Sequence, residues 1–169
     1  MNYLSEKYDT TDFLYFTSRD YTQCREPLLK EYDNVTIDPK GTFSVSPAGV
    51  NAIGESVVYF GYFSTPHFGK WLIDYLSVFW WKPSFNAKYV YTSDGEDVKD
   101  YPYAVRLLKL AGVDTDCVLR IAQPMTFCKV YAPEASFVHD KYILPVFATI
   151  YSKIVHNLPV NVPAYEKSI

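Results

Sequence analysis

The pattern of hydrophobic and polar positions changes near residue 55. Residues 1–50 are mostly polar and interrupted by proline and glycine, with short strand-like pieces only at 35–37 and 42–45. Residues 56–61 then form a compact run of β-branched and aromatic side chains, which is typical of a buried strand. The pattern predicts an irregular N-terminal segment with short strands over residues 1–50, followed by an ordered domain.

A helix is predicted directly after this strand. Residues 64–66 read Ser-Thr-Pro, which combines a hydroxyl N-cap candidate with a proline for the first turn. Pro83 is expected to end the helix. Its apolar positions recur at spacings of three and four and predict one broad buried face: Phe68, Trp71, Leu72, Tyr75, Leu76, Phe79 and Trp80.

Strands and helices continue to alternate along the chain. We predict a strand at 88–93, a turn at 93–95, a helix at 103–110 closed by Gly112, strands at 117–121 and 127–131, and a last helix within 142–155 that begins near Pro145. This alternation favours an α/β fold, a Rossmann-like, mainly parallel sheet with flanking helices. The domain is expected to span residues 51–157, with a linker over 158–169.

Composition limits the partners. The 169 residues suffice for one sizeable core, and a net charge of −3 without a basic stripe argues against nucleic acid. Aromatic residues make up 18% of the chain and gather between residues 59 and 103. A large aromatic core is the favoured interpretation, and a platform on which sugar rings stack is the alternative.

Cysteine usage and the N-terminus bear on location. Cys24, Cys117 and Cys128 form no CxxC pair, so neither a disulfide framework nor a metal site is indicated. The first twenty residues lack a basic region and an apolar run, and no stretch has the length of a membrane span. We therefore expect a cytoplasmic protein with reduced thiols.

The first strand–helix junction, residues 63–67, is the candidate ligand site, because open α/β sheets bind ligands beyond the carboxyl ends of their strands. His67, Lys70 and Asp74 follow at spacings of three and four and are expected to share one polar stripe. His67 could act as a general base or contact a substrate hydroxyl, and it could equally be a surface or capping residue. Lys70 and Asp74 could hold an acceptor or a phosphate, and they could equally form a solvated pair.

An acidic turn follows the second predicted strand. Asp94, Glu96, Asp97 and Asp100 surround Gly95 without the spacing of a calcium loop, so a solvated turn is favoured. The sequence contains no GxSxG, P-loop or GxGxxG motif, which leaves hydrolase, phosphate-loop and dinucleotide functions without support.

Three segments in order resemble a known family. They are residues 58–62 with 67–74, Ser77 and Trp80; residues 107–113; and residues 124–137, which contain Pro133-Glu134-Ala135-Ser136-Phe137. Together they resemble glycosyltransferase family 61, which includes many capsular-polysaccharide biosynthesis proteins. The chain departs from the family at Lys70, where a second histidine is common, and at Val78, where an arginine is frequent.

The resemblance implies the N-terminal, acceptor-side half of a GT-B enzyme. Such an enzyme would move a sugar from a nucleotide-sugar donor to a glycan acceptor in capsule or surface polysaccharide synthesis, with inversion and without a metal or other cofactor. His67 and Asp74 would be its catalytic candidates, and Ser64, Thr65, Lys70 and Glu134 would bind the acceptor. The donor would be held by a missing C-terminal domain or a partner chain, so we expect the chain to be incomplete alone.

Alternatives to this interpretation remain open. The chain could be a non-catalytic carbohydrate-binding or scaffold module that complements a separate partner. It could also form a homodimer through exposed aromatics such as Trp81 and Phe85. Peripheral association with a membrane is a further alternative.

Overall fold

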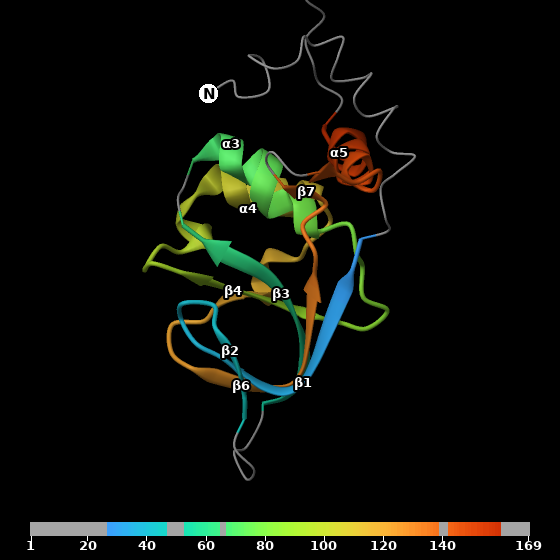
Figure 1. Cartoon of the computed structure of the whole chain (residues 1–169). Helices are drawn as coiled ribbons and strands as arrows, with labels where there is room; N and C mark the ends of the chain where they lie inside the picture. The colour runs from blue at the N-terminus through green and yellow to red at the C-terminus, as the bar shows by residue number, and fades with distance from the viewer. Residues whose placement is uncertain (1–26, 47–52, 65–66, 139–141, 160–169) are drawn as a thin grey trace, which may run out of the picture.

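The computed structural model describes residues 27–46, 53–64, 67–138 and 142–159 (Figure 1). The strands are β1 (Leu29–Ile37), β2 (Phe43–Val45), β3 (Ile53–Phe63), β4 (Lys88–Ser93), β5 (Val118–Arg120), β6 (Met125–Pro133), β7 (Phe137–Val138) and β8 (Tyr142–Ile143). A mixed helical segment covers residues 68–78, and the longer helices are α4 (Pro102–Leu110) and α5 (Phe147–His156). Short 3-10 turns occur at Val98–Asp100 and Thr115–Cys117.

Six strands form one mixed sheet in the order β2-β1-β6-β3-β4-β5. The pairs β6–β3, β3–β4 and β4–β5 are parallel, whereas β1 runs antiparallel to both of its neighbours. The prediction of an α/β fold with a mainly parallel sheet is therefore confirmed. Strands β7 and β8 form a separate two-stranded pair.

The N-terminal segment contributes more to the sheet than its composition predicted. Strand β1 has nine residues instead of three and lies between β2 and β6, in register from Leu29 opposite Pro133 to Ile37 opposite Met125. The expected boundary at residue 50 therefore falls between strands of the same sheet. Residues 1–26 of the predicted segment, and residues 160–169 of the predicted linker, lie outside the described residues.

The predicted strand–helix alternation is confirmed from β3 to β5. Helix α4 begins with Pro102, whose fixed φ suits the first turn, and ends before Gly112, which has φ +81°. The last helix, α5, starts at Phe147, two residues after the expected start near Pro145, and residues 142–143 before it form strand β8.

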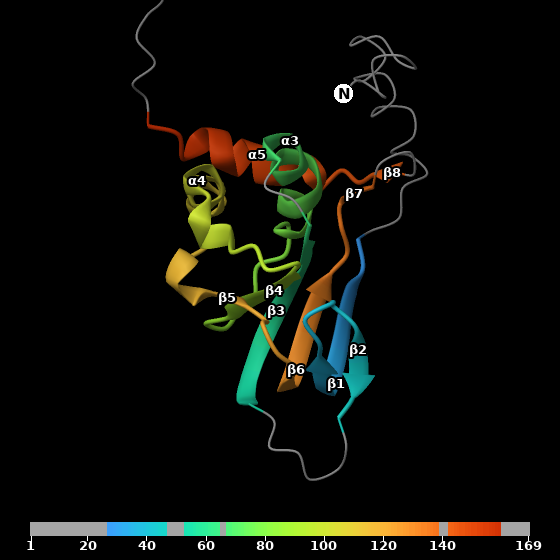
Figure 2. The ribbon, with the colours of Figure 1, turned by 90° about the vertical axis from the view of Figure 1, so that its left-hand side faces the viewer.

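The helices gather on one face of the sheet (Figure 2). The first hydrophobic cluster joins Phe60 and Tyr91 of the strands to residues of the helical segment, α4 and α5. A second cluster on the opposite face contains Val57 and Val90 and no residue of these helices; it is closed partly by Phe43 of β2. In the described part of the chain, helices therefore flank the sheet on one side only, which differs from a doubly wound arrangement.

Aromatic side chains form much of the core, as favoured from composition. Trp71, Tyr91 and Phe63 are among the largest fully buried residues, and the rings of Phe63 and Trp71 lie 5.6 Å apart. Trp81 and Phe85 were expected to be exposed, and this was wrong. Both are half-buried and pack against Tyr131 of β6, at 5.1 and 5.3 Å between ring centroids.

Two further features concern location and chemistry. Within the described ranges, no helix combines the length and apolar character needed to cross a bilayer. Cys117 and Cys128 are free thiols, and Cys24 lies outside the described residues.

Candidate functional site

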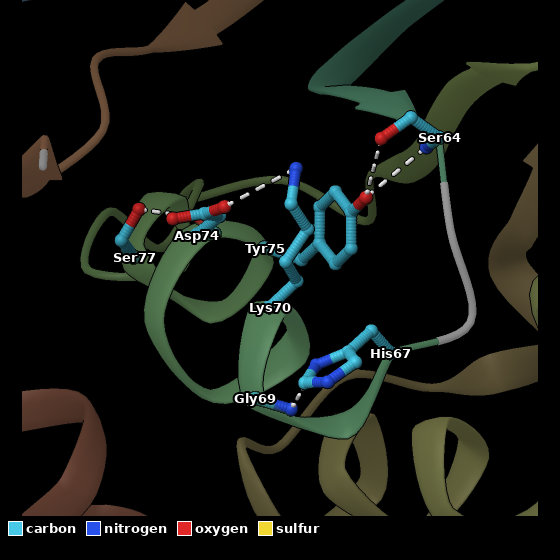
Figure 3. Close-up of polar contacts among 7 residues, drawn as sticks. All are labelled: Ser64, His67, Gly69, Lys70, Asp74, Tyr75 and Ser77. Atoms are coloured by element: carbon cyan, nitrogen blue, oxygen red, sulfur yellow. Dashed lines mark hydrogen bonds and ion pairs between the residues drawn. The ribbon is translucent and has the colours of Figure 1, made fainter. Parts of the chain in front are cut away.

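The candidate site begins where β3 ends. Ser64 is exposed, and both its backbone N–H and its hydroxyl contact the Tyr75 hydroxyl, at 3.1 and 3.3 Å (Figure 3). Tyr75 belongs to the helical segment, so this contact fixes the exit of β3 against the following helix. Ser64 is thus engaged by the fold, while its neighbour Thr65 lies outside the described residues.

The helical segment differs from the predicted helix in its start, end and type. It begins at Phe68 with His67 as N-cap, so Ser64 does not cap it, and it ends at Val78, five residues before Pro83. Only Phe68–Lys70 is α-helical; Trp71–Tyr75 is a π-helix and Leu76–Val78 a 3-10 helix. Such π turns are rare and occur frequently at functional sites.

His67 caps the segment through its side chain. Its Nδ1 accepts a hydrogen bond of 3.1 Å from the backbone N–H of Gly69. Gly69 permits this approach, because a Cβ at that position would lie 3.2 Å from two atoms of the imidazole ring. Since Nδ1 is the acceptor, the neutral ring carries its proton on Nε2.

The tautomer decides what His67 can do. With Nε2 protonated, the exposed side of the ring donates a hydrogen bond and cannot remove a proton from a substrate hydroxyl. Action as a general base would require the Gly69 contact to break and the proton to move to Nδ1. The geometry therefore favours substrate contact over the base role expected for His67.

Lys70 and Asp74 meet, with 3.9 Å between Nζ and Oδ2 (Figure 3). Their side chains are 50% and 43% exposed, so the pair contributes only tenths of a kcal/mol, roughly 0.3–0.5. The His67 imidazole bonds the Gly69 N–H and neither side chain of this pair, although the Lys70 N–H donates to the His67 carbonyl at 3.0 Å. The three residues share one segment, but the described side-chain contacts join only Lys70 and Asp74.

Glu134 lies at the other end of the helical segment. Its backbone carbonyl accepts a 2.7 Å bond from Trp80 Nε1, and its carboxylate accepts bonds from the Leu28 N–H at 3.1 Å and the Tyr142 hydroxyl at 2.9 Å. These contacts tie the start of β1 and strand β8 to the loop after β6. Glu134 therefore has a clear structural role, separate from the His67 end.

Two buried serines complete this junction. The Ser77 hydroxyl donates to the Asp74 carbonyl, and the Ser136 hydroxyl donates to the Ser77 carbonyl, both at 2.6 Å. Both side chains are fully buried. Sequence reasoning assigned neither a role, although both occur in the segments that carry the family resemblance.

A cavity lies at the opposite edge of the sheet. It has a volume of about 360 Å³ and is lined by residues at the amino ends of β3 and β4 and by Cys117, including Glu55, Phe85 and Lys88. The ion pair between Lys88 and Glu55, at 2.6 Å, sits on its wall. Burial, together with the nearby Asp114, raises the pKa of Cys117, which disfavours a nucleophilic thiolate there.

Among the described residues, three buried polar atoms have no hydrogen-bond partner: Trp71 Nε1, the Tyr103 hydroxyl and the Tyr151 hydroxyl. Burial raises the pKa of Tyr151 to about 12, and the charge of Asp74 adds to the effect. In the described residues no group of three or more His, Cys, Asp or Glu side chains surrounds a common point where a metal could bind.

No family model, curated protein or solved structure matches this chain. The resemblance to glycosyltransferase family 61 therefore rests on the three quoted segments alone. A function has to be argued from the chemistry of the site.

Proposed function

We propose that this chain is the acceptor-side half of a glycosyltransferase that transfers sugar from a nucleotide-sugar donor to a surface glycan in the cytoplasm. The supporting observation is that His67, the N-cap of the helical segment, is an exposed hydrogen-bond donor just after a parallel strand. Lys70 follows in the α-helical part of the segment and Asp74 on the π turn. Under this proposal the sheet corresponds to the Rossmann-like N-terminal half of a GT-B enzyme, and the donor binds to another domain or chain.

In this role His67 positions the acceptor. Nε2–H donates to a sugar oxygen, while the Gly69 contact holds the ring in place. Asp74 could accept the proton of the acceptor hydroxyl, because its carboxylate is half-exposed and only loosely paired with Lys70. Holding the nucleotide phosphate would fall to the donor-binding part.

The experiment is a calorimetric titration of the full chain with neutral oligosaccharides and, separately, with nucleotide sugars. The test variant is His67→Asn, because asparagine is itself a good N-cap and removes the imidazole without removing the cap. His156→Asn, on the exposed end of α5, is the matched control.

We expect oligosaccharide binding that His67→Asn weakens and His156→Asn does not, with no heat from nucleotide sugars alone. Tight binding of a nucleotide sugar would reverse the division between acceptor and donor halves. Absence of both kinds of binding would contradict the proposal.

The donor tautomer of His67 also favours a second candidate, a non-catalytic carbohydrate-binding or scaffold module. Such a module needs a hydrogen-bond donor but no base. Incubation of the chain with an oligosaccharide and nucleotide sugars in a lysate of the source cells, which would supply the donor-binding part, followed by mass spectrometry, separates the two. An elongated oligosaccharide supports the enzyme. Oligosaccharide binding without a product, whichever nucleotide sugar is added, supports the module.

A further inference from the structure

Two loops meet beside the candidate site. Strands β3 and β4 are parallel neighbours and end at the same level, with Phe63 opposite Ser93. The segments that follow them therefore start side by side at the carboxyl edge of the sheet, at Ser64 and Asp94. This edge is where open α/β sheets bind ligands.

Aromatic rings from both segments form a continuous row. Phe68, on the first turn of the helical segment, lies 5.6 Å from Tyr103 in an edge-to-face contact, and Tyr103 lies 6.0 Å from Tyr101. Tyr101 in turn packs on the buried Phe63 at 5.9 Å. We call Phe68, Tyr101 and Tyr103 the aromatic ledge.

Phe68 is the exposed end of this ledge. Its side chain is 51% exposed, although the neighbouring rings of the same segment, such as Trp71, are fully buried. Tyr103 lies between Phe68 and Tyr101 in the row, and its hydroxyl is buried. The ledge thus presents an apolar surface to the solvent chiefly through Phe68.

Two carboxylates of the acidic turn lie near the Tyr101 end of the ledge. Tyr101 donates a hydrogen bond to Glu96, and a hydrogen bond to Asp94 is the main cause that raises the pKa of Tyr62. Both carboxylates are exposed, and each is anchored to an aromatic ring at one oxygen. The remaining oxygen lone pairs are available to accept hydrogen bonds.

The charge of this rim selects against anions. The turn carries four carboxylates and only one cation, Lys99: Asp94, Glu96, Asp97 and Asp100 are the acidic residues. A second cation, Arg120, contacts the turn, where its guanidinium donates to the Gly95 carbonyl. A phosphate or a uronate would be repelled here, whereas a hydroxyl-rich neutral ring would find acceptors.

We propose that the aromatic ledge binds one neutral or amino-bearing pyranose unit of a glycan, with its C–H face on the exposed ring of Phe68 and its hydroxyls toward Asp94 and Glu96, beside Tyr101. The proposal rests on the proposed function and names the acceptor chemistry of the same edge. His67 directly precedes Phe68, so its Nε2–H would lie at the border of the bound ring.

The test uses the full chain and simple probes: methyl β-glucoside, glucosamine, glucuronate and uridine diphosphate. Binding is followed by the NMR resonances of the aromatic rings during titration to 100 mM sugar. The variants are Phe68→Ala, Phe68→Tyr, which keeps a ring, and Phe85→Ala, which removes a ring at the opposite edge of the sheet. Melting temperatures confirm that each variant is folded.

We expect the two non-acidic sugars to shift the Phe68 and Tyr101 resonances, with weaker binding of glucuronate and uridine diphosphate. Phe68→Ala should weaken the binding of both sugars about tenfold, the loss of one stacking contact of about 1.4 kcal/mol. Phe68→Tyr and Phe85→Ala should leave it within a factor of two.

Three results would overturn the proposal. Sugar binding that Phe68→Ala leaves unchanged would place the sugar elsewhere while preserving a carbohydrate function. Preferential binding of uridine diphosphate at the ledge would assign this edge to a donor. Ring resonances that do not move with any sugar would exclude the ledge, and the oligosaccharide titration would then decide the proposed function independently.

Discussion

Gly41 occupies a backbone position that other residues cannot fill without cost. Its φ is +80°, and a Cβ there would lie 2.6 Å from the Tyr59 hydroxyl, which is hydrogen-bonded to Thr92 at 2.9 Å. Gly95 has φ +102° with no atom within 4 Å of such a Cβ. Comparing substitutions at the two glycines therefore separates the cost of a positive φ from the cost of a steric clash.

We predict that Gly95→Ala lowers the free energy of unfolding by about 1–2 kcal/mol through its positive φ alone. Gly41→Ala should cost about 1–3 kcal/mol more, because the methyl group also displaces the Tyr59–Thr92 pair. Urea denaturation of both variants measures the difference. Equal losses would show that the turn moves aside freely.

The unpartnered hydroxyl of Tyr151 leads to an unusual expectation for a buried residue. Removing a buried hydroxyl without a partner relieves its desolvation, so Tyr151→Phe should leave the stability unchanged or raise it by up to about 1 kcal/mol. Tyr91→Phe is the contrast, since the Tyr91 hydroxyl bonds both Asp97 and the Val98 N–H at 2.9 Å. That variant should lose about 1–3 kcal/mol. Similar effects of the two substitutions, measured by thermal melting, would contradict this assignment.

At the level of elements, local patterns predicted the strands better than the helical segment. The prediction of β4 matched its bounds because its run of β-branched and aromatic residues has sharp polar limits. The helical segment buries Trp71, Tyr75 and Phe79 as predicted, but Phe68 of the predicted buried face is 51% exposed, and the regular geometry is lost. The π turn leads into a 3-10 turn, in which the Ser77 carbonyl accepts a hydrogen bond from Ser136, 59 residues away. A local sequence pattern cannot predict such a distant contact.

This contact between elements can be tested at Ser136. The Ser136 hydroxyl and the exposed Thr149 hydroxyl both donate to a backbone carbonyl at 2.6 Å, but the Ser136 bond is buried and joins residues 59 apart, whereas the Thr149 bond is local. We predict that Ser136→Ala lowers the free energy of unfolding by about 1 kcal/mol and Thr149→Ala by less than half of that. Guanidinium denaturation provides both values. A larger loss from Thr149→Ala would mean that the serine junction does not hold the helical segment in place.

At the level of the whole molecule, the sequence predicted which edge of the sheet to inspect but not which residues meet there. Parallel strands bring their carboxyl ends together, so the position of His67 followed from the strand order. The approach of Tyr101 and Tyr103 to Phe68 depends on how α4 docks, and the capture of the Glu134 carboxylate depends on β1 and β8. Both are tertiary contacts that spacing along the chain does not encode.

Three tyrosines in different parts of the fold make its free energy of unfolding depend on pH in the alkaline range. Burial raises the pKa of Tyr91, burial raises that of Tyr151 to about 12, and a hydrogen bond to Glu96 raises that of Tyr101 to about 12. The same groups titrate near 10 in the unfolded chain. Because the folded pKa values are the higher ones, the unfolded chain loses its protons first as the pH rises.

The stability is therefore independent of these phenols' ionisation below pH 10 and falls progressively between about pH 10 and 12, where the unfolded chain ionises more readily. Urea midpoints at half-unit steps from pH 8 to 11.5 should stay level at first and then fall. Tyr151→Phe removes one titrating group and should make the fall shallower, whereas Tyr32→Phe, at a half-buried position on the other face of the sheet, serves as a control that loses a tyrosine outside this group. A flat profile through pH 11.5 would mean that the phenols ionise as easily in the folded chain as in the unfolded one.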